Sequence, residues 1–319
     1  MGLGTRPYTR GLHDLGSGGY AWLQPDGGWG WSNAGLVVDS GQSLLVDTLF
    51  DLKLTHEMLD AMHKANAAAK QIETLVNTHA NADHCNGNEL VGAKEIIASS
   101  ATLREMEQDS PERLAQIMRN TSSMGPTGAY LEECFGPFDF EGITHTLPNR
   151  TFENVLTVQV GSKSLLLKQV GPCHTKGDIL AYCEQDRLIF TGDILFIEGH
   201  PILWEGPVEN WISACDYILS LNVETVVPGH GPITDKRGVR AVKSYLSYIR
   251  DEAHVRYQSG LSVYDAAMDI SLTDFDSWGD AERIAVNVQT LYREFGADVD
   301  AERAGAFDLM ARVYRNRKS

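Results

Sequence analysis

The sequence contains few cysteines and no long hydrophobic run. Its five cysteines are an odd number, and none of them belongs to a Cys-x-x-Cys pair. A disulfide framework is therefore not expected, and this cysteine usage favours a reducing, cytoplasmic location. No apolar stretch reaches the ~18 residues that span a bilayer, and residues 1–16 lack the apolar core of a signal peptide. We expect no membrane partner.

Positive charge is also scarce. The chain has 27 Lys and Arg residues against 43 Asp and Glu residues, which gives a formal net charge of −16. A surface of this sign repels phosphate backbones, so we expect no nucleic-acid partner. Solubility is the simplest explanation of the acidity. These absences leave a small molecule as the expected substrate.

The hydrophobic pattern predicts two similar series of strands, each followed by a helix. Hydrophobic residues make up 43% of the 319 residues, enough for one large domain or two modest ones. Short apolar or alternating runs predict strands at 20–23, 29–39, 43–47, 72–77, 156–160, 164–170, 178–183, 188–191 and 223–227. Helical spacing predicts helices at 52–66 and 211–221. This repeated order favours an α/β fold with two sheets back to back and helices outside, a four-layer αββα sandwich.

Two segments fall outside that repeat. Residues 101–140 combine a polar helical pattern with an irregular stretch at 121–140, and we interpret them as an insertion over the site. Later in the chain only helical patterns remain, at 239–258, 263–270 and 280–316. We therefore expect a main domain at residues 1–235 and a C-terminal helical extension at 236–319 packed on it. The extension is either a simple cap or a surface through which the protein forms a homo-oligomer.

Residues of the types that bind metals follow the ends of several predicted strands. The segments are Thr78-His79-Ala80-Asn81-Ala82-Asp83-His84, Gly171-Pro172-Cys173-His174-Thr175, Thr191-Gly192-Asp193, Pro228-Gly229-His230-Gly231 and, more weakly, Leu45-Val46-Asp47-Thr48. A single histidine after a strand is more often structural than a ligand. Several His and Asp residues at strand ends, however, form a mixed donor set that suits zinc and similar metals. Glycines beside three of the segments allow tight turns that direct side chains into one cavity.

The first of these segments resembles the His-x-His-x-Asp-His signature of the metallo-β-lactamase superfamily. His174, Asp193 within Thr-Gly-Asp, and His230 within Pro-Gly-His-Gly follow in the family's order. Ser32-Asn33-Ala34-Gly35-Leu36 and Leu45-Val46-Asp47-Thr48 are similar to the family's early strands. The resemblance covers about residues 19–234 and leaves out the helical extension. It implies an αββα sandwich with one or two metal ions at the sheet edges.

The resemblance also implies the ligands of two half-sites. Position by position, the metal ligands carried over to this chain are His79, Asp83, His84, His174, Asp193 and His230. The first half-site would consist of His79, position 81 and His174. The second half-site would consist of the other ligands, with Asp193 bridging the two or serving the second.

Position 81 departs from the family pattern, because it holds Asn where the family has His. An amide oxygen is a weaker zinc donor than a neutral imidazole. We therefore predict that the second half-site binds metal first and tightly, and that the first half-site is weak or empty. Alternatively, Asn81 binds substrate or the nucleophilic water, or it marks a protein that has lost activity.

The chemistry that the resemblance implies is metal-assisted hydrolysis. A bound metal ion, zinc first and iron or manganese as alternatives, lowers the pKa of water toward neutrality and supplies hydroxide. The candidate catalytic residues are Asp83, His79, His174 and Asn81. His79 or His174, if free of metal, is a candidate general base or acid. We expect hydrolysis of an ester, lactone, amide or thioester.

Two other classes of function fit the same centre. One is a non-hydrolytic enzyme, such as a lyase, a dehalogenase or an iron-dependent oxygenase, because fold does not decide chemistry. The other is a metal-binding protein without turnover. The identity of the metal separates the redox enzymes from the hydrolases, and absence of bound metal would favour a binding protein.

Aromatic residues near the motifs are candidates for a substrate pocket. Trp29 and Trp31 lie beside a glycine-rich turn, and Phe196, His200 and Trp204 follow Asp193. Packing in the hydrophobic core is the alternative for each aromatic residue. For His200, an exposed position on the surface is the alternative that we favour.

Overall fold

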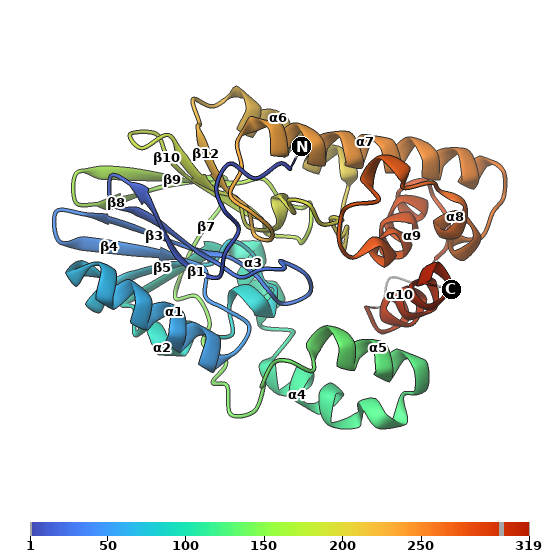
Figure 1. Cartoon of the computed structure of the whole chain (residues 1–319), viewed down its shortest axis with the longest axis horizontal. Coiled ribbons are helices and arrows are strands. Elements are labelled where there is room, and N and C mark those ends of the chain that lie inside the picture. The colour runs from blue at the N-terminus through green and yellow to red at the C-terminus, as the bar shows by residue number, and fades with distance from the viewer. Residues whose placement is uncertain (1, 300–302, 319) are drawn as a thin grey trace.

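The computed structural model describes residues 2–299 and 303–318 and contains two β-sheets (Figure 1). The first sheet has seven strands in chain order: β1 (Gly11–Gly16), β2 (Gly19–Leu23), β3 (Ala34–Asp39), β4 (Gln42–Val46), β5 (Thr74–Val76), β6 (Glu95–Ser99) and β7 (Arg150–Phe152). The second has five, in the order β12 (Thr225–Val227), β11 (Leu188–Phe190), β10 (Ile179–Cys183), β9 (Lys163–Gln169) and β8 (Val155–Val160). Strands β4 to β7 are parallel, and so is the β11–β12 pair.

The two sheets face each other across one hydrophobic layer. Strand β9 alternates buried and partly exposed residues, so that Leu165 and Leu167 point into this layer. Val46 and Val76 of the first sheet belong to the same cluster. At Gly35 the sheets come so close that an added Cβ would lie 2.1 Å from the Phe190 ring. The two facing sheets of the predicted sandwich are therefore present.

Helices cover the outer faces of both sheets. The α-helices are α1 (Leu52–Ala65), α2 (Asn88–Val91), α3 (Ser100–Met106), α4 (Pro111–Asn120), α5 (Gly125–Phe135), α6 (Val208–Ser220), α7 (Lys236–Gln258), α8 (Val263–Asp269), α9 (Ile284–Glu294) and α10 (Arg303–Lys318). Helix α1 buries Met58 and Met62 on the first sheet, and α6 buries Trp211 and Ile218 on the second. The αββα prediction is confirmed.

The regions outside the sandwich differ in part from the expectations. Residues 121–140 were expected to be irregular, but they contain α5, whose first turn holds Pro126. Proline suits the first helical turn because the N–H it lacks has no partner there. The helix expected at 280–316 is divided into the short helix η6 (Ala281–Arg283), α9 and α10, and residues 300–302 lie outside the described residues.

The insertion and the helical extension contact each other (Figure 1). Thr127 of α5 donates a hydrogen bond to Asp308 of α10 at 2.7 Å, and the rings of Tyr130 and Tyr314 lie 5.3 Å apart. The division into two domains at residue 235 and the expected homo-oligomer stay predictions. Across residues 2–299 and 303–318, no helix is both long enough and apolar enough to cross a membrane.

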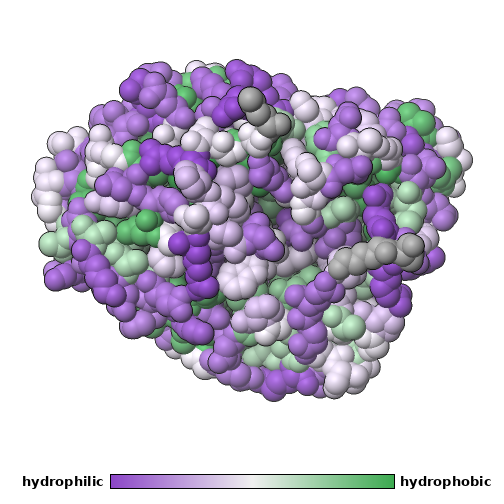
Figure 2. All heavy atoms as spheres, viewed as in Figure 1, coloured by the Kyte–Doolittle hydropathy of each residue, from purple (hydrophilic) through white to green (hydrophobic). Residues whose placement is uncertain are grey.

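The surface and the cysteines agree with the composition. The face in Figure 2 is mostly hydrophilic, with apolar residues in small areas between polar ones. All five cysteines are buried and free.

Candidate metal centre and substrate cavity

The ligand residues predicted from sequence lie at one edge of the sandwich, each just after a strand. His79 follows β5, and the short helix η2 (Ala82–His84) carries Asp83 and His84. Asp193 lies on η4 (Gly192–Ile194) after β11, and His230 follows β12. His174 comes after β9. Since β5, β11 and β12 end at the same edge, these segments meet there.

The Asp193 carboxylate is the centre of the cluster. Its Oδ1 lies 3.1 Å from Nε2 of His84. Its Oδ2 lies 3.3, 3.5 and 3.6 Å from Nε2 of His174, His230 and His79 respectively. Each of these side chains is at most 4% exposed. Four imidazoles from three separate segments therefore converge on one buried carboxylate.

Asp83 completes the group from the other side. Its Oδ2 lies 3.2 Å from His230 Nε2 and 3.8 Å from His84 Nε2. There are two sets of three donor atoms, and within each set the atoms lie within 4.8 Å of one another. One set comes from His79, His84 and Asp193, and the other comes from Asp83, His84 and His230. The second set has the same residues as the predicted second half-site.

Hydrogen bonds behind the cluster fix the orientation of every imidazole. In each ring Nδ1 contacts an oxygen: Asp47 Oδ2 for His84, Thr78 Oγ1 for His79, Ile202 O for His174 and Gly27 O for His230, at 2.7–3.0 Å. Such contacts direct Nε2 to the centre and make it a better donor to a metal. Sequence reasoning ranked the Asp47 segment as weak and missed Thr78, because neither residue is a ligand in the motif.

Glycine and asparagine residues let the loops approach each other. A Cβ on Gly229 would lie 2.0 Å from Asp193 Oδ1, so only glycine fits there. Asn33 donates from Nδ2 to the carbonyls of Pro228 and Gly231, at 3.0 and 2.9 Å. The Ser32-Asn33 segment thus holds the loop that carries His230.

The cluster has the unsatisfied polar atoms that a cation would satisfy. Among the described residues, His79 Nε2, His84 Nε2 and Asp193 Oδ1 are buried and make no hydrogen bond of acceptable geometry. Buried polar atoms without partners are rare in proteins, because each one loses its hydration. Imidazole and carboxylate donors facing one point fit a divalent ion such as zinc, manganese or iron.

The charges of the cluster are strongly coupled. Burial alone would lower the pKa of His84, but the carboxylates of Asp193 and Asp83 outweigh it and hold this pKa well above its usual value. The same carboxylates, against burial, raise the pKa of His230 to about 9. Burial and the charge of His84 hold the pKa of His79 well below its usual value. Without a metal ion, protons on His84 and His230 therefore balance the two carboxylates.

Asn81 lies against His174 rather than pointing to Asp193. Its Nδ2 lies 2.8 Å from His174 Nε2, while His174 Nδ1 donates to the Ile202 carbonyl at 2.7 Å. With its proton on Nδ1, His174 accepts the amide N–H at Nε2, and that nitrogen is then not available to a metal. The first half-site of His79, position 81 and His174 stays a prediction.

Comparison with known proteins identifies the family. The sequence pattern of the metallo-beta-lactamase superfamily matches residues 27–230, more than half of the chain. The chain belongs to this superfamily. The matched region holds every ligand position from His79 to His230 and leaves out α7–α10.

Related sequences are distant. The chain is 23% identical to metallo-beta-lactamase type 2 of Bacillus cereus over 208 residues, which cover 63% of this chain and 68% of the relative. It is 22% identical to a beta-lactamase-like protein 2 homolog of Caenorhabditis elegans, over 68% of this chain and 61% of that one. Both matches support the superfamily and leave the substrate open.

Solved structures extend the similarity into the helical extension. A stereoselective inverting sec-alkylsulfatase from Pseudomonas sp. has a TM-score of 0.68 and 16% identity, and the match covers 92% of this chain. This chain spans about half of the alkylsulfatase, 51% of its length. A metallo-beta-lactamase from Pontibacter korlensis has a TM-score of 0.54 and 19% identity, over 75% of this chain. These likenesses concern the fold alone.

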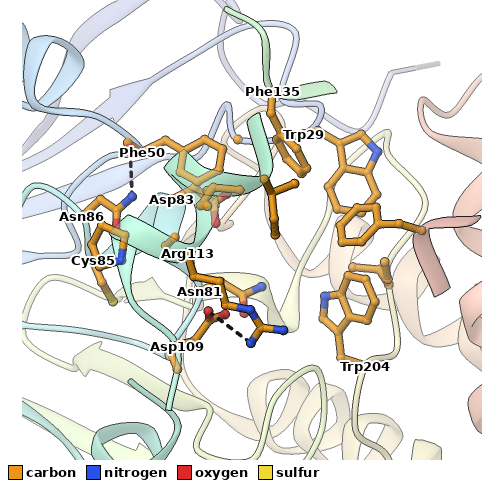
Figure 3. Close-up of a pocket in the computed structure, with 18 of the residues that line it drawn as sticks. Trp29, Phe50, Asn81, Asp83, Cys85, Asn86, Asp109, Arg113, Phe135 and Trp204 are labelled. Atoms are coloured by element: carbon orange, nitrogen blue, oxygen red, sulfur yellow. Dashed lines mark hydrogen bonds and ion pairs between the residues drawn. The ribbon is translucent and has the colours of Figure 1, made fainter. Parts of the chain in front are cut away.

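A cavity of about 440 Å³ opens above the ligands of this superfamily member (Figure 3). Asn81, Asp83, His174, Asp193 and His230 form its floor. Three of the five aromatic candidates, Trp29, Phe196 and Trp204, line it. Its size is that of pockets for small organic molecules.

The structure places Trp31 and His200 away from this cavity. The Trp31 ring lies 4.7 Å from the Phe138 ring. His200, which we expected to be exposed, is fully buried, and its Nδ1 contacts the Gly279 carbonyl at 2.8 Å. The aromatic packing that we named as the alternative applies to both residues.

Sequence reasoning missed the cavity walls that come from outside the motif. Leu114 and Phe135 belong to the insertion, while Arg283 and Phe307 belong to the helical extension. The hydrophobic pattern of each helix was visible, but no local signal says which cavity a helix will cover. Only the placement of the insertion over the site was predicted.

Proposed function

We propose that this protein is a metal-dependent hydrolase that acts on a small organic substrate such as an ester, lactone, amide or thioester. The observation that carries the proposal is the convergence of four imidazoles on Asp193, with Asp83 beside two of them. Several of these buried donor atoms make no hydrogen bond of acceptable geometry among the described residues. Relatives named metallo-beta-lactamase and sec-alkylsulfatase support hydrolysis as the reaction type. The cavity above the cluster supports a small substrate.

The ion that binds first would be held by the second half-site, which consists of Asp83, His84 and His230 together with Asp193. Asp83, His84 and His230 form one of the two donor sets whose atoms lie within 4.8 Å of one another, and this set matches the family's second half-site. When bound there, zinc or a similar ion acidifies a water molecule and polarises the bond to be cleaved. The compartment, cytoplasmic by its cysteine usage, belongs to the proposal as well.

Beside that ion, His174 would transfer protons and Asn81 would form hydrogen bonds with water or substrate. The Ile202 carbonyl holds the His174 proton on Nδ1, so Nε2 would act as a general base once water or substrate replaces the Asn81 N–H there. Asn81 Oδ1 is buried and has no partner among the described residues, so it can accept a hydrogen bond from water or from substrate. His79 would remain as a ligand for a second ion that binds more weakly.

The deciding experiment counts metal ions in purified protein and in an Asn81→His variant. We expect one tightly held ion per native chain, because the amide occupies His174 and weakens the first half-site. The variant restores imidazole at position 81 and should hold two. Elemental analysis after extensive dialysis gives both values. Two tightly held ions in native protein would contradict the one-strong-site proposal.

Activity is tested with a matched pair of variants. Asp83→Ala removes a ligand of the proposed first ion and should abolish hydrolysis of an ester panel. Asp109→Ala, which changes a carboxylate at the rim of the same cavity, should retain the reaction. Full activity in Asp83→Ala would rule out metal catalysis at this centre.

A further inference from the structure

The walls of the cavity are mostly apolar and come from four distant parts of the chain. Trp29 precedes β3, Leu114 and Phe135 belong to the insertion, and Trp204 lies after β11. Phe307 of the helical extension closes the group. In Figure 3, Trp29, Phe135 and Trp204 surround the space beside Asn81 and Asp83. A molecule that fills the cavity beside the candidate ligands contacts these rings.

The charged residues of the wall already have counter-ions. Arg113 Nη1 lies 3.8 Å from Asp109 Oδ1 at the rim, where both side chains are more than half exposed. Arg283 Nη2 lies 3.0 Å from Asp280 Oδ2. Its Nη1 donates to the His200 carbonyl at 3.0 Å, and its Nε has no partner among the described residues. The two guanidinium groups of the wall thus offer no unbalanced positive charge to an anionic group.

The apolar wall is held in place rather than left mobile. Trp29 Nε1 donates to Glu282 at 3.2 Å, and the Arg283 guanidinium lies 4.3 Å above the Trp29 ring. The Trp29 ring also contacts Phe135 and Phe307 at 5.8 Å between ring centres. A ligand that binds between fixed apolar walls loses little free energy to ordering them.

We infer that the part of the substrate lying in this cavity is a neutral apolar group, such as a medium-length acyl or alkyl chain. Burial of such a group removes apolar surface from water on both sides. An anionic group would lose its hydration there and meet only paired guanidinium groups. The inference rests on the proposed function for the reaction itself, which would cleave an ester or thioester carrying that group.

Binding without turnover tests the cavity alone. Calorimetry with 1-alkanols of increasing length should show affinity rising about fourfold for each methylene until the cavity is full. The fatty acid of the same length should bind at least tenfold more weakly at pH 8. Affinity that does not depend on chain length, or carboxylates that bind more tightly than alkanols, would overturn the inference.

A cavity-filling variant and a matched control test the location. Leu114→Trp replaces a partly exposed aliphatic side chain of the wall with a bulkier indole ring. The variant should prefer alkyl chains of shorter length. Leu90→Trp makes the same change on α2, where Leu90 is 37% exposed and lies outside the cavity, and should leave the preference unchanged. An identical chain-length profile in native protein and Leu114→Trp would contradict the assignment.

The two proposals fail in different ways. If the alkanol series behaves as expected but no ester of any length is hydrolysed, the cavity assignment stands and the hydrolase proposal falls. If short and long esters are hydrolysed equally and alkanols do not bind, the hydrolase proposal stands and the cavity assignment falls.

Discussion

At the scale of single residues, the hydrogen-bond partners behind the cluster matter as much as the ligands themselves. Asp47 has a backbone φ of 64° and binds both Thr78 and His84. It accepts from the Thr78 N–H and hydroxyl, each at 2.7 Å. One buried carboxylate thus orients two ligand residues, His84 directly and His79 through Thr78. The motif spacing predicted the ligands but gave no measure of this support.

His200 provides a pH prediction at this scale. Burial lowers its pKa to about 4, so the folded protein keeps it neutral between Tyr245 and Trp278 while the unfolded chain binds a proton near pH 6.5. The stabilisation is present above pH 6.5 and is lost as the pH falls toward 4. From pH 7 to pH 5 the loss should be about 2 kcal/mol.

The comparison variant is His200→Asn, which keeps a donor for the Gly279 carbonyl but does not titrate. Urea unfolding with chelator present, at pH 5 and pH 7, gives the free energy of unfolding of both proteins. The native protein should lose more stability than the variant. Equal losses of unfolding free energy in the two proteins would show that His200 does not contribute to the pH dependence between pH 5 and pH 7.

At the scale of elements, the short helix η6 connects the extension to the rest of the cavity. The buried Glu282 accepts from Trp29 Nε1 at 3.2 Å and from the Tyr130 hydroxyl at 2.8 Å. Trp29 lies before β3 and Tyr130 on α5, so one carboxylate joins a loop, the insertion and the extension. A packed helical cap alone would not require this contact.

Loss of the Glu282 contact should weaken the packing of η6 against the Trp29 loop and α5. Glu282→Ala leaves the Trp29 N–H and the Tyr130 hydroxyl without a partner and should cost about 1–3 kcal/mol of unfolding free energy. Glu282→Gln retains an acceptor and should cost less. Urea unfolding measures the stability, and hydrogen exchange of the α5 amides locates the change. Equal effects of Ala and Gln would mean that the hydrogen bonds do not matter.

Sequence patterns predicted the sandwich elements better than the insertion, for a physical reason. Strands such as β4 and β9 show their burial in local alternation or apolar runs, because one sheet face always meets the core. Helix α5 contains Gly125, Pro126 and Gly128, which read as irregular. It packs against α10, a contact between distant parts of the chain. Local pattern does not contain that information.

At the scale of the whole molecule, the metal centre links segments from β5 to β12. Metal should therefore stabilise the folded protein rather than one loop. Zinc at a hundredfold excess over its dissociation constant should raise the free energy of unfolding by about 2.7 kcal/mol. Thermal unfolding of chelator-treated protein, before and after zinc addition, measures the change. An Asp83→Asn variant should gain less unfolding free energy from zinc. A native unfolding temperature that zinc does not change would contradict metal binding at this site.

The floor and the last part of the cavity wall are made at different times. Ribosomes release the earlier residues first, so every ligand up to His230 emerges before Arg283 and Phe307 have been added. Translation therefore delivers the reactive end of the cavity while its wall is still open on one side. A frameshift or protease cut between these positions would remove that side of the wall while sparing all the ligands, and any hydrolysis left in such a fragment should be less selective.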